Sequence, residues 1–307
     1  MPHHHMQNHR LAYFLLILTT LFWAGNFVLA RAVHASVPPI GLAFWRWFAV
    51  AVFIVPWAWK ELREQWPVMK SHPWLMIAFG VFSVGAFNTL VYIGLQTTTA
   101  VNGLLLLSSG PMFILLFSSL MLGQAFKLFQ IIGLIVSAVG VLLVLTHGDL
   151  SNLVGLESNT GVLWVLGGVI SWAIYSVLLH KKPAGIGGSG FFAATVIIGL
   201  IGLLPFYLIE TFIQNRPVHV NLDLILTVAY VAVFASILAY LFWNKAVEMI
   251  GASRSSPFIH LIPAFGLVLS VIFLGEHMKQ TDFIGLTLIF LGLVVAAGKF
   301  GLSKLQP

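Results

Sequence analysis

Arg46 is the residue whose position most clearly suggests a chemical role, because it interrupts an otherwise apolar stretch at residues 39–58. A charged side chain in the middle of a membrane span costs about 2.5–3.5 kcal/mol on insertion scales, so Arg46 needs a partner or water. Its guanidinium can bind the carboxylate of a substrate. The alternative is an arginine that bonds to backbone carbonyls or extends to the membrane surface, since it lies close to the start of its stretch.

Aromatic and amide side chains recur in pairs at helical spacing. The pairs are Trp23 and Asn26, Trp172 and Tyr175, Asn88 and Tyr92, and Tyr240 and Asn244, with Trp243 beside the last pair. Residues three or four apart share one face of a helix, and aromatic rings with a few polar groups suit a small amphipathic ligand. We therefore expect these residues, with Arg46, to bind the substrate. The alternatives are Trp and Tyr at the membrane interface and Asn side chains that join helices.

Proton coupling and bending have their own candidate residues. His260 lies three residues before Pro263 and can relay protons, because histidine titrates near neutral pH; alternatively it is a neutral side chain bonded inside the bundle. Glu276 and Glu210 fall at the ends of apolar stretches, where a carboxylate can either couple to protons or anchor a helix end. Pro111 and Pro263 are expected to break two helices and let them bend.

Composition identifies the class of protein that must position these residues. Of 307 residues, 59% are hydrophobic and only 8% are charged, whereas about a quarter are charged in a soluble domain. The chain is therefore predicted to be an all-helical integral membrane protein. Its net charge of +6 does not indicate nucleic-acid binding, because the basic residues stand singly between apolar runs. Cys is absent, which excludes disulfides and thiolate metal sites, and we expect no metal or cofactor.

Ten apolar stretches are each near the roughly 20 residues that cross a bilayer core. They cover residues 11–30, 39–58, 73–95, 100–122, 128–146, 161–180, 190–209, 222–243, 254–274 and 282–299. With the N-terminus inside, eleven of the 15 Lys and Arg residues fall in cytoplasmic segments and three in outer segments, with Arg46 within a span. This bias predicts that both termini are cytoplasmic, in a bacterial-type inner (plasma) membrane.

The chain also contains an internal repeat. Shifted by 152 positions, residues 100–140 match residues 252–292, with Pro111 on Pro263; a fainter match at an offset of 149 covers the first span of each half. Each half has five spans, an odd number, so the second half must enter the membrane inverted, as in transporters that use alternating access. The predicted organisation is a tail at 1–10, a five-helix repeat at 11–146, an outer loop at 147–160, an inverted repeat at 161–299 and a tail at 300–307.

Five features, together with the repeat, carry a resemblance to a known family. They are Phe22-Trp23-Ala24-Gly25-Asn26-Phe27; Arg46; Tyr240-Leu241-Phe242-Trp243-Asn244-Lys245-Ala246 followed by Gly251-Ala252-Ser253; Pro263; and Leu274-Gly275-Glu276 followed by Gly285 and Gly292. The set resembles the EamA-type members of the drug/metabolite transporter superfamily. The resemblance covers nearly the whole chain and implies a ten-helix secondary transporter, often an exporter of amino acids, related metabolites or drugs. Gln124 departs from the pattern, because many relatives repeat there the Glu matched by Glu276.

We therefore expect a secondary transporter, not an enzyme, that moves small amphipathic metabolites such as amino acids outward. An exporter of drugs or other cationic compounds is the alternative. No nucleotide-binding motif is found, so proton exchange or facilitated diffusion drives transport. A channel would need a polar lining or carbonyl filter, and an intramembrane enzyme would need a nucleophile with its base, paired carboxylates or a metal cluster. The expected partners are the substrate and membrane lipid, and the chain is expected to be a monomer or a homodimer.

Overall fold

The computed structural model describes residues 2–123, 127–146, 148–149, 160–250, 258–259 and 261–297, and every regular element in these ranges is a helix. The α-helices are α1 Pro2–Ala32, α2 Pro39–Trp57, α3 Trp59–Ser71, α4 Pro73–Gly80, α5 Asn88–Gly94, α6 Ala100–Leu107, α7 Gly110–Leu122, α8 Leu128–Thr146, α9 Thr160–Leu178, α10 Gly188–Leu208, α11 Leu222–Ala232, α12 Ala239–Ile250, α14 Leu261–Leu274 and α15 Gln280–Ala297. The π-helices are η1 Val81–Phe87, η5 Ile209–Ile213 and η6 Val233–Leu238, and η4 Leu179–Lys181 is a 3₁₀ turn.

Seven helical segments in the described residues are long and apolar enough to cross a membrane. They are Arg10–Ala32, Pro39–Trp57, Pro73–Gly94, Ala100–Leu122, Thr160–Lys181, Gly188–Ile213 and Leu222–Ala246. The three other predicted spans contain shorter apolar helices, at Leu128–Leu143, Leu261–Leu274 and Gln280–Gly292. Most of the expected loop at 147–160, the tail at 300–307, and residues 254–257 of the ninth predicted span lie outside the described residues.

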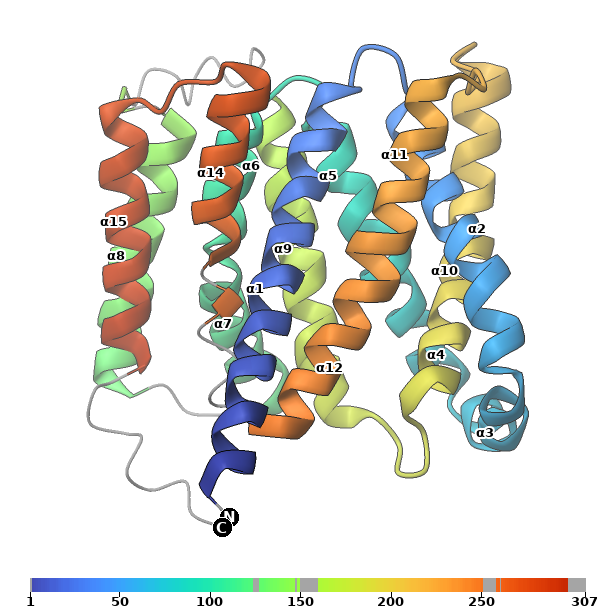
Figure 1. The fold of residues 1–307 in the computed structure, drawn as a ribbon. Helices are drawn as coiled ribbons and strands as arrows, with labels where there is room; N and C mark the ends of the chain where they lie inside the picture. Colours follow the sequence, from blue (N-terminus) through green and yellow to red (C-terminus); the bar gives the residue numbers. More distant parts are fainter. Residues whose placement is uncertain are drawn as a thin grey trace.

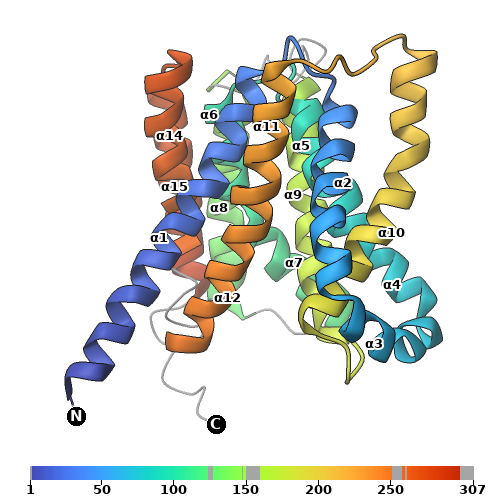
Figure 2. The same ribbon diagram turned by 45° about the vertical axis from the view of Figure 1, so that its right-hand side comes forward.

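The helices run between two ends of a bundle (Figures 1 and 2). One end, at which α1 begins and α15 ends, is called the base here, and the opposite end is called the top (Figure 1). Four pairs of neighbouring helices account for much of the packing: α2 with α10, α1 with α12, α5 with α9, and α8 with α15. Each pair takes one helix from each half of the chain, so the two predicted repeats are interleaved rather than separate.

The interface between α8 and α15 contains the same glycine contact twice. A Cβ atom added at Gly140 would lie 2.6 Å from the carbonyl oxygen of Gly285, and one added at Gly292 would lie 2.5 Å from that of Gly133. Both glycine pairs are related by the offset of 152 residues found in the sequence. The two helices therefore approach so closely that only glycine fits at these positions, and the two halves make the same contact on each other.

The fourth predicted span is interrupted, as its proline suggested. α6 ends at Leu107 and α7 begins at Gly110, with Pro111 in the first turn of α7. Proline lacks the N–H that would continue the helical ladder, so a break at this point is expected. Pro263 likewise lies in the first turn of α14, which begins at Leu261. Whether either proline acts as a hinge remains a prediction.

Two π-helices occupy matching places in the two halves. η1 covers residues 81–87 and η6 covers residues 233–238, and a shift of 152 places one upon the other. A π-turn widens a helix locally and exposes backbone carbonyls, and such turns are frequent at functional sites. The sequence pattern did not indicate them, because an extra residue in one turn leaves an apolar stretch equally apolar.

α3 was not predicted from the sequence. It follows α2 at the base, buries Leu62 and Met69, and exposes Trp59 and Trp66. Pro67 lies inside this helix. Exposed Trp rings beside Lys and Arg suit the boundary between lipid and water.

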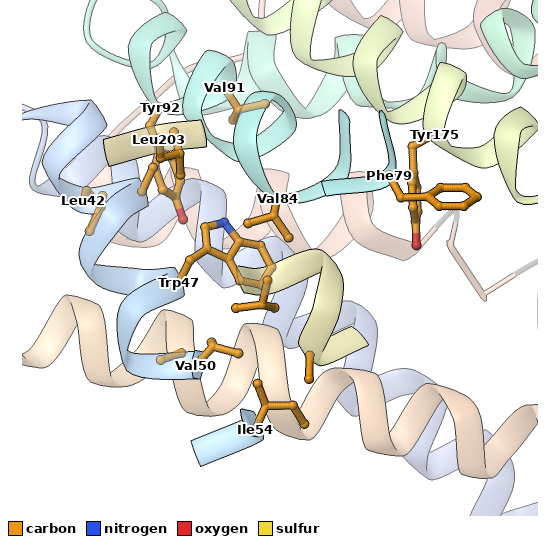
Figure 3. Close-up of a cluster of buried hydrophobic side chains, with 14 of the residues drawn as sticks. Leu42, Trp47, Val50, Ile54, Phe79, Val84, Val91, Tyr92, Tyr175 and Leu203 are labelled. Carbon is orange, nitrogen blue, oxygen red and sulfur yellow. The ribbon is translucent and has the colours of Figure 1, made fainter. Parts of the chain in front are cut away.

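The main cluster of buried side chains runs between the halves. Figure 3 shows Leu42 and Trp47 of α2 near Leu203 of α10, with Val50 and Ile54 farther along α2, and it also draws side chains of the same cluster from α4, η1, α5 and α9. These α2 residues recur three to five positions apart, which is the helical pattern of one buried face. This face holds α2 in place, and α2 carries Arg46.

Candidate functional site

Arg46 is buried at the centre of a polar cluster formed by four segments. Only 4% of its surface is exposed. Its Nη1 donates to Asn26 Oδ1 (2.9 Å), Asn88 Oδ1 (2.9 Å) and Tyr92 OH (2.6 Å), and its Nε donates to Ser236 Oγ (3.0 Å). The structure thus brings Arg46 together with three of the other predicted substrate-binding residues, Asn26, Asn88 and Tyr92.

The cluster is itself connected, and its members come from α1, α2, α5 and η6. Tyr92 OH donates to Asn26 Oδ1 at 2.6 Å, and Ser236 Oγ donates to the carbonyl of Val231 at 2.7 Å. That last acceptor lies five residues earlier, which is the spacing of the π-helix. Ser236 belongs to the second half of the chain, so the cluster joins the two repeats.

No carboxylate of the described residues pairs with Arg46. An ion pair among these residues joins Arg31 Nε to Glu276 Oε1 at 3.9 Å and does not involve Arg46. All four acceptors of Arg46 are neutral oxygens, and its Nη2 has no hydrogen-bond partner in the described part of the chain. A buried cation is costly unless it is paired, so this guanidinium retains the capacity to bind an anion.

Trp47 lies beside the guanidinium of Arg46. Its ring centroid is 5.0 Å from Arg46 Cζ, and its buried Nε1 has no acceptor among the described residues. A buried N–H without a partner is uncommon in a folded protein. Sequence reasoning missed both Trp47 and Ser236, because Trp is common on apolar spans and Ser is common for packing.

The repeat-related positions of the cluster differ in chemistry. Offsets of 149 and 152 place Asn26 on Tyr175, Arg46 on Thr195, Asn88 on Tyr240 and Tyr92 on Asn244. The second set is nearer the base, and it contains no cation. Tyr240 is 36% exposed and Asn244 is exposed, whereas Tyr92 and Asn88 are buried. The two sets are therefore packed differently in this structure.

Aromatic rings continue from Arg46 toward these base-side residues. Trp47 contacts Phe192 at a centroid distance of 6.4 Å, and Phe192 stacks on Tyr240 at 4.7 Å. The ring centroids of Trp172 and Tyr175 are 5.2 Å apart, so the two side chains of that predicted pair are in contact. An aromatic line with polar tips thus leads from the guanidinium toward the base.

The predicted Trp residues of the other helices are also brought together. Trp23 lies 5.7 Å from Trp243, and Trp23 Nε1 donates to the carbonyl of Ala235 in η6 at 3.2 Å. Trp172, the repeat equivalent of Trp23, is 38% exposed and contacts Phe87 at 5.1 Å. All ten predicted substrate-binding residues lie in the described region, on α1, α2, α5, α9 and α12.

Glu276 lies away from the Arg46 cluster, at a helix start. Its Oε1 and Oε2 accept from the backbone N–H groups of Ala100 and Val101, each at 2.9 Å. Carboxylates are favourable at the N-terminus of a helix, so Glu276 stabilises the start of α6. His260 lies outside the described residues, and its predicted role in proton coupling stays a prediction.

Comparisons with known proteins agree with this architecture. Residues 10–146 and 159–298 match the model of the EamA-like transporter family. The uncharacterized transporter YyaM of Bacillus subtilis is 27% identical, over 95% of each chain. A "probable amino-acid metabolite efflux pump" of Salmonella typhimurium is 24% identical, over 92% of this chain and 93% of its own.

A crystal structure supports the fold alone. It is 19% identical, covers 93% of this chain and 96% of its own, and superposes with a TM-score of 0.55. The relatives named above are transporters, and the seven long apolar helices fit a multi-pass membrane protein. This protein is therefore a membrane transporter and not an enzyme. Because the family model matches almost the entire chain, the chain belongs to the EamA-like transporter family.

Proposed function

We propose that this protein is a secondary transporter of small amphipathic metabolites that carry a carboxylate, with amino acids as the leading class. The observation that carries the proposal is the free Nη2 of the buried Arg46, which faces no carboxylate of the described chain. A substrate carboxylate would pair with this group and remove the cost of an unpaired buried cation. The neighbouring aromatic rings would contact the apolar part of the substrate.

The positive charge of Arg46 makes an exporter of cationic compounds the weaker of the two candidate functions. An exporter of cationic compounds would have to bring its substrate close to Arg46, and like charges repel strongly in a medium of low dielectric constant. None of the observed contacts places a carboxylate beside the cluster to offset that repulsion. The cationic-compound exporter therefore remains the second candidate.

The packing of the two halves supports alternating access. α2 packs along α5 on the upper side of Arg46, whereas the repeat-equivalent helices, α10 and α12, meet through the stacked rings of Phe192 and Tyr240 and do not pack along each other. Together with the exposure of Tyr240 and Asn244, this fits a state that is closed at the top and looser at the base. In the proposed cycle the two halves exchange these arrangements, so that the site faces each side in turn.

The orientation of the chain in the membrane sets the direction of transport in this proposal. We infer ten spans with both termini in the cytoplasm, so that the base faces the cytoplasm, because most Lys and Arg residues fall in the segments assigned to that side. Outward transport is consistent with the efflux described in the name of the Salmonella relative. The substrate then moves from the cytoplasmic base to the outer top of a protein that lies in an inner membrane.

Uptake of radiolabelled leucine into inside-out membrane vesicles tests this function. Export in the cell corresponds to uptake in these vesicles, and we expect saturable uptake that excess unlabelled leucine inhibits and that leucinamide, which lacks the carboxylate, inhibits far less. Imposing a pH gradient, with a His260→Ala variant in parallel, separates proton exchange from facilitated diffusion. No saturable uptake of any amino acid, together with saturable uptake of a cationic dye, would replace the proposal with the second candidate.

A further inference from the structure

Two glutamates join α2 and α10 at both of their ends. At the top, Glu210 accepts from the backbone N–H groups of Ile40 (3.2 Å, Oε1) and Gly41 (2.6 Å, Oε2) at the start of α2. At the base, Glu61 Oε2 accepts from the backbone N–H of Gly190 (3.0 Å) and from Ser189 Oγ (2.8 Å) at the start of α10. We call these the top contact and the base contact.

The top and base contacts are one contact made twice. The offset of 149 residues that relates the first spans of the two halves places Glu61 on Glu210 and Gly41 on Gly190. Each glutamate follows the end of one helix and binds the start of the other. Because α2 and α10 run in opposite directions, the inverted repeat puts the two copies at opposite ends of the bundle.

Both helix starts are crowded around the glycine whose N–H meets the carboxylate. A Cβ atom added at Gly190 would lie 2.9 Å from the backbone carbon of Glu61, and one added at Gly41 would lie 3.5 Å from Glu210 Oε2 and closer still to Val218. The base contact is extended by Gln65, one turn after Glu61, whose amide exchanges two hydrogen bonds of 3.1 Å with the backbone of Gly187. These helix starts are thus shaped to receive the partner segment.

Symmetry distinguishes contacts that must change during transport from contacts that need not. When two inverted halves exchange conformations, a contact present on one side only is replaced by its repeat equivalent on the other side. The packing of α2 along α5 is of this kind, because the repeat-equivalent α10 and α12 meet through the stacked rings of Phe192 and Tyr240 and do not pack along each other. A contact already present in both copies is unchanged by the exchange.

We propose that α2 and α10 stay joined at both ends throughout the transport cycle, and that the other spans move against this fixed pair. Glu61 and Glu210 are then positioning residues that hold Arg46, through α2, in one place while α5 and α12 alternately close on the pair. This inference rests on the proposed function for its transport readout, but the fixed pair itself can be tested without a substrate.

Paired cysteines test the proposal directly, because the natural chain contains none. The pairs are Phe44→Cys with Tyr207→Cys near the top contact, Gln65→Cys with Gly187→Cys at the base contact, and Gln96→Cys with Arg216→Cys as the control. The rings of Phe44 and Tyr207 stack at 4.5 Å between α2 and α10. The control pair joins the segments after α5 and η5 through a bond of 3.2 Å, which links α5 to the fixed pair at the top.

Each pair is bridged with a short bis-methanethiosulfonate reagent and then released with reductant. Leucine uptake should be the same before and after bridging of the top pair, the base pair or both. Bridging the control pair should lower uptake at least tenfold, and reductant should restore it. Loss of uptake on bridging either α2–α10 pair, restored by reductant, would overturn the inference.

Spin-label distances provide the readout that needs no substrate. The labelled pairs are Ser36→Cys with Phe212→Cys at the top, Glu64→Cys with Ala184→Cys at the base, and Ile201→Cys with Lys245→Cys between α10 and α12. We expect one distance population for each of the first two pairs and two populations for the third. Two populations at either end of the α2–α10 pair would refute the fixed pair even if leucine were not transported.

Charge-neutral variants separate positioning from substrate contact. Glu61→Gln and Glu210→Gln weaken the two contacts, so the maximal uptake rate should fall while KM for leucine stays within twofold. Glu64→Gln, on the same helix as Glu61 but outside the contact, is the matched control and should leave the rate unchanged. A rise in KM with an unchanged maximal rate would instead place these glutamates on the substrate path and overturn the inference.

Discussion

Replacing Arg46 with Gln would remove the one charge of the central cluster while keeping a polar side chain there. The proposed bond between Nη2 and a substrate carboxylate is charge-assisted, and such bonds contribute about 1.5–3 kcal/mol. Since about 1.4 kcal/mol corresponds to a factor of ten, KM for leucine should rise about 10- to 150-fold. Leucinamide, which has no carboxylate, should show little change.

The assay is competition between leucine and leucinamide for counterflow in proteoliposomes that hold the purified variant. Arg46→Lys is the matched control, because lysine keeps the charge but cannot reach Ser236 and Asn26 at once as the planar guanidinium does. We expect it to fall between the natural protein and Arg46→Gln for leucine. An equal loss for both ligands would refute the reasoning, since Arg46 would then only hold the four segments together.

Two further predictions concern packing and charge. Gly140→Ala places a Cβ atom 2.6 Å from the carbonyl oxygen of Gly285, so it should destabilise the protein by about 1–3 kcal/mol, whereas Gly202→Ala, with no atom within 4 Å, should leave the melting temperature unchanged or raise it. The N–H of Gly190, followed by the hydroxyl of Ser189, lowers the pKa of Glu61 below its ordinary value of 4.5. Its stabilising effect is therefore present above pH 4.5 and is lost as the pH falls through the lowered pKa, so the melting temperatures of the natural protein and Glu61→Gln should converge on acidification.

The membrane class and the repeat could be predicted because they depend on patterns that the sequence states directly. An apolar stretch of sufficient length can only be a helix in lipid, and a shared offset relates two halves whatever their detailed packing. The glycines at 140 and 292 belong to the repeated sequence, and the structure places both where α8 and α15 touch. The number of spans and the orientation of the termini stay predictions.

The candidate site was predictable in its residue types but not in its arrangement. Arg46, Asn26 and the pair of Asn88 and Tyr92 were selected independently of one another, and the structure places all three side chains within hydrogen-bonding distance of Arg46. Ser236 could not be selected, because its position depends on a π-turn that adds a residue to one helical turn. Sequence spacing alone assumes regular helices and cannot include such a turn.

The pairing of Glu61 with Glu210 was present in the sequence but was not recognised. Both begin the pattern Glu-x-x-x-Gln, at 61–65 and 210–214, and both lie at the offset of 149. The pattern was hidden because α3 was not predicted and Glu210 was interpreted by itself. A search for repeated charged residues, rather than repeated apolar ones, would have found it.

The double carboxylate contact has a consequence for how such a chain can arise. A single five-helix unit that carried one glutamate after its second helix and one glycine at that helix's start would, beside an oppositely oriented copy of itself, make both contacts at once. This is the self-complementary interface of a two-fold dimer. Joining the two copies in one chain preserves that interface. It also allows the two copies to differ in sequence elsewhere. Here that freedom is visible in the cluster, where one copy has Arg46 and the other has Thr195, so that a symmetric frame carries a single cationic site.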